Sequence, residues 1–250
     1  MPTFQHDGVE IAYLDQGTGD PIVLVHGFAS NKETNWVQPG WVSTLTRDNR
    51  RVIALDNRGH GQSTKLYDPA DYHTDLMAAD VAALIAHLGL ENADVMGYSL
   101  GARITATFAA RHPERARAII LGGVGIKLVE VAGLHSEIAR SLELPSIEDV
   151  TDPQGKAFRL FAEQTKSDLR ALAACLRGSR QPLRREDLAA VAAPALVAAG
   201  TRDDIAGSPH ALAALFRNGH ALDIPDRDHM LATGDRVYKA GALAFLKERA

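Results

Sequence analysis

Short runs of apolar residues alternate along the chain with longer stretches whose apolar positions recur at helical spacing. The apolar runs lie at 21–25, 52–55, 93–96, 118–121, 195–200 and 221–224. Because these runs contain few polar positions, they predict strands buried on both faces, as in a parallel sheet covered by helices. Helical spacing predicts helices at 72–90, 102–112, 210–216 and 234–247, and a shorter helix opens at Pro39-Gly40.

This alternation of strands and helices predicts an α/β fold, with a mostly parallel sheet flanked by helices. The alternation stops after Gly125, and from 126 to 191 only helical patterns occur, divided by prolines and glycines. The strand pattern resumes at Ala195. We therefore predict one α/β core, formed by residues 1–125 and 192–250, with an all-helical cap inserted at 126–191.

The most informative motif is Gly97-Tyr98-Ser99-Leu100-Gly101, which lies between an apolar strand and a helix. A serine at the apex of so sharp a turn has a strained backbone, and side chains on both flanks would collide with it. Glycines at 97 and 101 remove those collisions and leave the Ser99 hydroxyl clear of the sheet. The following helix supplies free N–H groups where an oxyanion would form. A tight turn with a merely capping serine is the alternative.

Three strand ends carry residues that could act together, because ligands of a parallel sheet bind beyond the carboxyl ends of its strands. Ser99 follows one strand, Asp203 and Asp204 follow the strand that ends at Gly200, and His229 follows the next strand. A serine hydroxyl needs a base to attack at neutral pH, and imidazole titrates in the right range. A carboxylate must then hold the tautomer of the ring and stabilise the imidazolium.

These motifs resemble those of the α/β-hydrolase fold family over essentially the whole chain. The resemblance rests on the glycine-flanked serine, the order serine–acid–histidine, the position of the insertion, His26-Gly27-Phe28 and the loop at 56–63. It implies that Ser99 is the nucleophile, His229 the base and Asp203 the residue that orients the base. It also implies an oxyanion hole formed by the backbone N–H groups of Phe28 and Leu100.

Because Asp203 and Asp204 are adjacent, their positions in the sequence do not show which of them orients the histidine. In the family the acid usually stands three residues after the glycine that ends the strand, and this spacing favours Asp203. Asp226 and Asp228 lie too near His229 in one loop to be preferred.

Composition and charge restrict the class of protein. The formal net charge of −4 argues against nucleic acid or an anionic membrane surface as a partner. Cys175 is the only cysteine, which excludes an internal disulfide, and no Cys/His cluster offers a zinc site. Neither a signal-peptide pattern nor a run long enough to span a membrane is present, so we expect a cytoplasmic protein. His26 is expected to shape the oxyanion loop, and His60 to belong to a structural turn.

A serine nucleophile favours acyl chemistry, because family members that attack alkyl carbon need a carboxylate nucleophile instead. We therefore predict a carboxylic-ester hydrolase that acts on a small-molecule ester through an acyl-enzyme and needs no cofactor. A serine-dependent C–C bond or lactone hydrolase is the alternative among enzymes. A non-catalytic small-molecule receptor with the same fold is the alternative outside them. We expect Tyr98, Phe161 and Leu172 to line the substrate pocket, although core packing explains the last two equally well. Acyl-chain preference and oligomeric state are not readable from the sequence.

Overall fold

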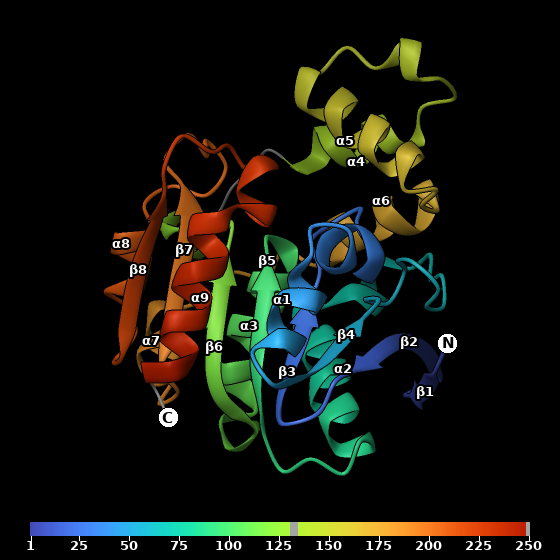
Figure 1. The fold of residues 1–250 in the computed structure, drawn as a ribbon. Coiled ribbons are helices and arrows are strands. Elements are labelled where there is room, and N and C mark those ends of the chain that lie inside the picture. Colours follow the sequence, from blue (N-terminus) through green and yellow to red (C-terminus); the bar gives the residue numbers. More distant parts are fainter. Residues whose placement is uncertain (131–134, 249–250) are drawn as a thin grey trace.

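A computed structural model describes residues 1–130 and 135–248 of the chain. Its strands form one eight-stranded sheet in the order β1-β2-β4-β3-β5-β6-β7-β8 (Figure 1). The pairs β1–β2 and β2–β4 are antiparallel, and all other neighbours are parallel. The strands are β1 (Thr3–His6), β2 (Val9–Gln16), β3 (Asp20–Val25), β4 (Arg50–Leu55), β5 (Ala93–Tyr98), β6 (Ala116–Gly122), β7 (Ala195–Gly200) and β8 (Gly219–Ile224). The predicted fold class is confirmed.

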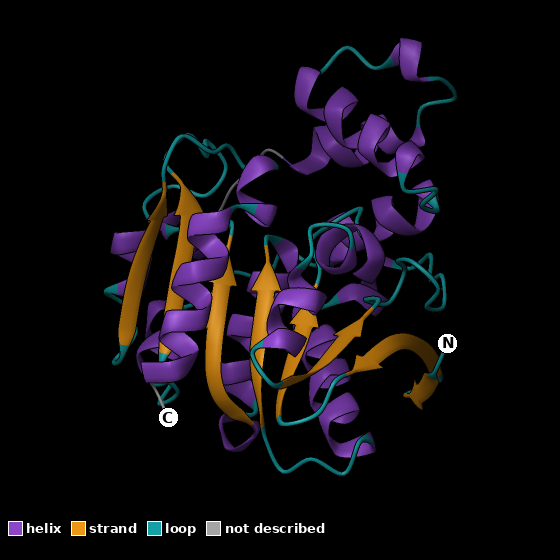
Figure 2. Ribbon diagram, in the orientation of Figure 1, coloured by secondary structure: helices purple, strands orange, loops and turns teal. Residues whose placement is uncertain are grey.

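Helices cover both faces of the sheet, as the layered view in Figure 2 shows. Helices α1 and α9 pack on one face, and α2, α3 and α8 pack on the other. Their bounds are α1 (Trp41–Arg47), α2 (Thr74–His87), α3 (Leu100–Arg111), α8 (Pro209–Ala213) and α9 (Arg236–Glu248). This arrangement gives the sheet two apolar interfaces.

Strand β3 illustrates why the strands read as continuous apolar runs. Successive side chains of a strand point to opposite faces. Ile22 and Leu24 accordingly pack in the layer with α1 and α9, whereas Val23 and Val25 pack in the layer with α2 and α3. Because both layers exclude water, each of the four buried positions from Ile22 to Val25 is apolar. The carboxyl ends of the parallel strands are thereby held rigidly at one edge.

Three helices between β6 and β7 lie beyond this edge (Figure 1). They are α4 (His135–Glu143), α5 (Pro153–Gln164) and α6 (Leu169–Gly178), and we refer to residues 135–178 as the helical insertion. Asp152 and Asp168 accept hydrogen bonds from the first N–H groups of α5 and α6. Arg159 of α5 donates to three carbonyl oxygens at the end of α4, those of Ser141, Leu142 and Leu144. The bonds of Arg159 thus tie α5 to α4.

The predicted insertion of 126–191 extends too far at its carboxyl end. Helix α7 (Arg185–Ala189) falls within that range, but it packs against the core instead of the helical insertion. Its Leu188 is fully buried among residues of α3, β6 and β7. An isolated helical pattern does not reveal which layer a helix will join, and this explains the difference. Residues 131–134, also within the predicted range, lie outside the described residues.

Candidate active site

The turn between β5 and α3 has the strained geometry that its sequence predicts. Ser99 has φ 54° and ψ −113°, a left-handed backbone conformation that non-glycine residues rarely adopt. A Cβ at Gly97 would clash with the Gly101 carbonyl, and a Cβ at Gly101 would clash with the carbonyls of Val25 and His26. The two glycines therefore permit the close approach of α3 to the sheet that leaves Ser99 at its edge.

Ser99, His229 and Asp203 form one chain of hydrogen bonds. The His229 Nδ1 lies 2.8 Å from Asp203 Oδ2, and its Nε2 lies 3.0 Å from Ser99 Oγ. A carboxylate can only accept, so Nδ1 carries the proton and Nε2 is free to accept from the serine hydroxyl. Histidine and aspartate are both buried. The arrangement can remove the hydroxyl proton as Ser99 attacks a carbonyl.

The structure distinguishes between the neighbouring aspartates. The second carboxylate oxygen of Asp203 accepts the N–H groups of Ile205 and Ala206 at 2.9 and 3.0 Å. Those bonds fix the Asp203 side chain toward the histidine. Asp204 contributes only its backbone carbonyl, which accepts from the Lys127 ammonium. Asp203 is therefore the carboxylate that the fold brings to His229.

The two backbone N–H groups expected to form an oxyanion hole have no partner among the described residues. Phe28 lies in the loop after β3, and Leu100 is the first residue of α3, where helical N–H groups lack intrahelical acceptors. Neither N–H donates to any group in the part of the chain that the structure describes. The N–H of Gly27, between β3 and Phe28, donates instead to Asn35 at 2.8 Å. Two donors are thus available next to Ser99.

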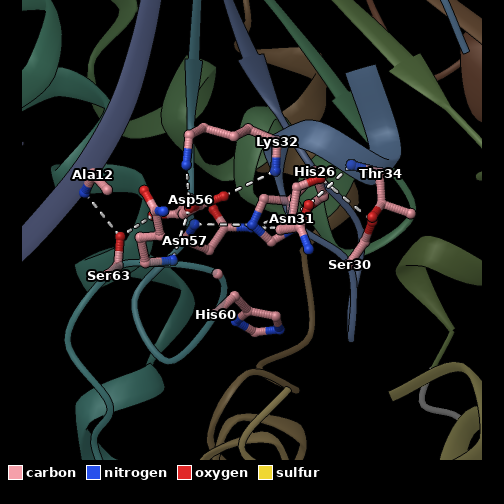
Figure 3. A network of polar contacts seen from close by, with 12 residues as sticks. Ala12, His26, Ser30, Asn31, Lys32, Thr34, Asp56, Asn57, His60 and Ser63 are labelled. Carbon is pink, nitrogen blue, oxygen red and sulfur yellow. Dashed lines mark hydrogen bonds and ion pairs between the residues drawn. The ribbon is translucent and has the colours of Figure 1, made fainter. Parts of the chain in front are cut away.

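A buried polar network holds the loop that carries Phe28 (Figure 3). The Asn57 N–H donates to His26 Nε2 at 3.0 Å, so the His26 Nδ1 carries the proton and donates to the Gly27 carbonyl at 2.7 Å. Burial lowers the pKa of His26 and keeps its ring neutral. The ring therefore fixes the backbone on the residue just before Phe28.

A second part of the same network is an ion pair with almost no access to water. The Lys32 ammonium donates to Asp56 at 2.5 Å, and both side chains are about 1% exposed. Burial alone would raise the pKa of Asp56, but the hydrogen bonds from Lys32 and from the Gln62 N–H outweigh it and lower that pKa. The ion pair joins the loop after β3 to the loop after β4. The ion pair thus helps to hold the loop that carries Phe28.

His60 beneath this loop predicts a dependence of stability on pH. Burial, and secondarily the proximity of His26, lowers the pKa of His60 from 6.5 to about 3, and its Nε2 has no partner among the described residues. Between these pH values the unfolded chain binds a proton that the folded protein does not. The free energy of unfolding should therefore decrease as the pH falls from about 6.5 toward 3, by up to about 1.4 kcal/mol per pH unit.

In His60→Phe this slope should become shallower, with His26 contributing what remains. Urea unfolding of both proteins at several pH values between about 7 and 4 measures the difference between the two slopes. An identical slope in wild type and variant would show that His60 is not the group responsible.

Two cavities meet at the serine and the histidine. The first, of about 460 Å³, is lined by Ser99 and His229 together with Arg103 and Arg180, and we call it the arginine cavity. The second, of about 470 Å³, is lined by Ser99 and His229 together with Tyr98, Phe161, Met230 and Leu231, and we call it the apolar cavity. Phe28 and Phe158 line both. A substrate could thus extend to either side of the serine hydroxyl.

Leu172 is one of the three residues expected to line the pocket, but it does not line it. Its side chain is fully buried in an apolar cluster that includes Ile138 and Ala162 of the insertion together with residues of the core. It borders neither cavity. Helical spacing identifies an apolar face but not whether another helix covers it, and here the neighbouring helices do.

Tyr98 lines the apolar cavity, but its hydroxyl has a structural partner. It donates to the His229 carbonyl at 2.6 Å. This bond ties the loop that carries His229 to the strand that precedes Ser99. Phe161 of α5 lines the apolar cavity as expected.

Sequence reasoning missed Arg103 and Arg180. Arg103 stands four residues after Ser99, one helical turn along the same face of α3, and this spacing could have indicated its position. Arg180 lies in a loop after α6, and no local pattern marks it. Within residues 1–130 and 135–248, no group of three potential metal ligands is found. In the same residues, no helix has the length and apolarity needed to cross a membrane.

Comparisons with known proteins identify the fold of the chain. A model of the alpha/beta hydrolase fold matches residues 20–134. The chain is 38% identical over 126 residues to a non-heme haloperoxidase of Rhodococcus erythropolis, covering 50% of this chain and 44% of that protein. It is 34% identical over 130 residues to 2-hydroxymuconate semialdehyde hydrolase of a Pseudomonas species, covering 52% and 45%. These matches span about half the length of the curated relatives.

A solved structure extends the similarity to the whole chain. The structure of a thermophilic esterase from Thermogutta terrifontis superimposes with a TM-score of 0.78 at 26% identity, covering 99% of this chain and 97% of that one. The chain therefore has the α/β-hydrolase fold.

Proposed function

We propose that this protein hydrolyses carboxylic esters through an acyl-enzyme formed on Ser99. The observation that supports this most is the hydrogen-bonded order of Ser99, His229 and Asp203 beside two unpartnered N–H groups. Similarity to a thermophilic esterase across nearly the full chain adds support.

The proposed reaction begins when Ser99 Oγ attacks the ester carbonyl and His229 Nε2 takes its proton. The N–H groups of Phe28 and Leu100 stabilise the resulting oxyanion. His229 then protonates the departing alkoxide, which leaves an acyl group on Ser99. A water molecule, deprotonated by His229, attacks this acyl group and regenerates the serine. Asp203 holds the ring and stabilises its protonated form throughout.

A C–C bond hydrolase is the second candidate, favoured by similarity to the Pseudomonas semialdehyde hydrolase. Both reactions use a serine and an oxyanion hole, so the triad does not separate them. A panel of p-nitrophenyl esters of increasing acyl length, assayed beside a lactone and a β-diketone, does separate them. Faster turnover of the esters supports the proposal, and faster turnover of the lactone or diketone replaces it with the alternative. No turnover of any compound would favour a receptor.

We further propose that the helical insertion is a lid that covers the reacting groups and selects the acyl chain. Phe158 and Phe161 of α5 line the apolar cavity. Two hydrogen bonds join the insertion to the core: Thr165 donates to the Ala29 carbonyl at 2.9 Å, and Tyr67 donates to Asp168 at 2.9 Å. A cover of this kind would exclude water from the acyl-enzyme.

Substitutions at Phe161 and Leu172 should have different consequences. Burying each methylene of an acyl chain favours binding by about 0.8 kcal/mol, or about fourfold, where an apolar wall surrounds it. Phe161→Ala removes part of that wall and should weaken the preference for longer esters. Leu172→Ala leaves a cavity in the insertion and should cost about 2–5 kcal/mol of stability with unchanged preference. Chain-length profiles and melting temperatures of both variants test this, and a changed preference in Leu172→Ala alone would contradict it.

A further inference from the structure

Two arginines line one side of the proposed catalytic centre without a carboxylate partner. Arg103 donates to the carbonyl oxygens of Gln181 and Leu128 at 3.0 and 3.1 Å. The Nε of Arg180 is buried and has no hydrogen-bond partner among the described residues. Both side chains border the arginine cavity, which also contains Ser99 and His229.

The arginines that are buried in the described chain are each paired with an acid, whereas Arg103 and Arg180 are partly buried and have no such pair. Arg50 bonds Asp94 at 2.6 Å, Arg58 bonds Asp80 at 2.7 Å and Arg159 bonds Glu163 at 2.7 Å. A buried charge is costly unless a counter-ion and hydrogen bonds compensate it. No such ion pair joins an acid to either cavity arginine within residues 1–130 and 135–248. Residues 131–134 are Val-Ala-Gly-Leu and contain no acid.

The electrostatic surroundings of the two guanidiniums also indicate that they lack a negatively charged partner. Loss of solvent lowers the pKa of Arg103 to about 10, and loss of solvent together with the charge of Arg103 lowers that of Arg180 to about 10. Both remain charged at neutral pH and repel each other across the cavity. A bound anion would relieve this repulsion and satisfy the free N–H groups.

The remaining charged residues of the cavity restrict the anion. Lys127, Glu130 and Asp204 also line its wall, so with the two arginines the cavity has three positive and two negative side chains, a formal excess of one positive charge. That single excess charge matches a singly charged anion better than a doubly charged group such as a phosphate monoester. A single carboxylate matches both the charge and the planar fork of a guanidinium.

We propose that Arg103 and Arg180 form a carboxylate subsite, and that the natural substrate is an ester carrying a second, free carboxylate. The proposal rests on the ester hydrolysis proposed above. The free carboxylate would occupy the arginine cavity while the uncharged remainder of the substrate extends into the apolar cavity. Arg180 would be the stronger determinant, because the guanidinium of Arg103 already donates to two carbonyl oxygens.

The test compares matched pairs of activated esters. The p-nitrophenyl monoesters of dicarboxylic acids, from glutaric to suberic, are each measured against the p-nitrophenyl ester of the fatty acid of the same chain length. A second pair, p-acetoxybenzoate and p-acetoxybenzamide, places the carboxylate on the leaving group. We expect the anionic member to have the higher kcat/KM by about 10- to 100-fold in at least one pair. Arg180→Gln should bring this ratio close to one.

Arg177→Gln is the matched control. Arg177 lies on α6 near Arg180 in sequence, but it is exposed and paired with Glu143, and it borders neither cavity. The ratio should keep its wild-type value in this variant. No preference for the anionic member in any pair would overturn the carboxylate subsite, while turnover of the neutral esters would leave the proposed function intact.

Binding measurements separate the subsite from the chemistry. If no ester is turned over, the proposed function fails, and calorimetry of the wild-type protein with adipate and with adipamide then judges the subsite alone. Binding of adipate but not adipamide, lost in Arg180→Gln and kept in Arg177→Gln, supports the subsite. Equal binding of the two compounds, or binding of neither, overturns it.

Discussion

Replacement of Ser99 by alanine is expected to reduce kcat for p-nitrophenyl esters by about a millionfold. Within residues 1–130 and 135–248, the hydroxyl is the group that the fold places against His229 Nε2, at 3.0 Å, at the start of the helix whose first residue is Leu100. Without it, neither acyl-enzyme formation nor proton transfer to the histidine is possible. The smaller alanine fits the same strained turn, so the fold should remain intact.

Ser30→Ala is the control for this experiment. Ser30 also lines the apolar cavity, but its hydroxyl donates to the Asn31 carbonyl and has no bond to the histidine. Its activity should stay within about tenfold of wild type, the range of a mutation that leaves the chemistry untouched. Circular dichroism and melting temperature establish that each variant is folded. A folded Ser99→Ala protein with near-normal turnover would disprove the proposed mechanism.

Asp203→Asn should lower kcat/KM by about 10⁴, the second-largest effect. An asparagine amide donates where the carboxylate accepts, so the His229 ring would be held in the tautomer with its proton on Nε2. That proton would point at Ser99 Oγ and prevent the ring from acting as a base. The loss should therefore appear in turnover, with the fold preserved.

Asp204→Asn provides the matched comparison, because the two aspartates are adjacent and only one reaches His229. Its kcat/KM should fall by less than about tenfold. The reverse ranking would assign the orienting role to Asp204. Small and equal losses in both variants would show that neither aspartate orients the histidine.

The sequence predicts the core of this site because its constraints are local. Gly97 and Gly101 are required by backbone contacts within a few residues of Ser99, and the apolar run of β3 reflects burial on both faces. The glycines and the apolar strand follow from the shape of one turn and the period of a strand. The aspartate that the fold turns toward the histidine is the one favoured by the spacing usual in the family that the motifs resemble.

The remaining features depend on contacts between distant segments, which no local pattern encodes. Leu172 and Phe161 are both apolar residues on helices, yet one packs in a buried apolar cluster and the other borders a cavity. The helical pattern of α7 likewise does not reveal that it packs on the core. Arg103 and Arg180 meet only because the loop after α6 returns to α3. Contacts of this kind can be identified only in the folded structure.

Mass spectrometry of the protein quenched in acid during turnover of p-nitrophenyl acetate tests the central claim most directly. In the proposed mechanism, deacylation needs His229 as a base, so acid stops it and preserves the intermediate. The account predicts one acetyl group per chain, carried by the peptide that contains Ser99 and absent from Ser99→Ala. Ester turnover that continues without any acetylated Ser99, or with the acetyl group on another side chain, would contradict it.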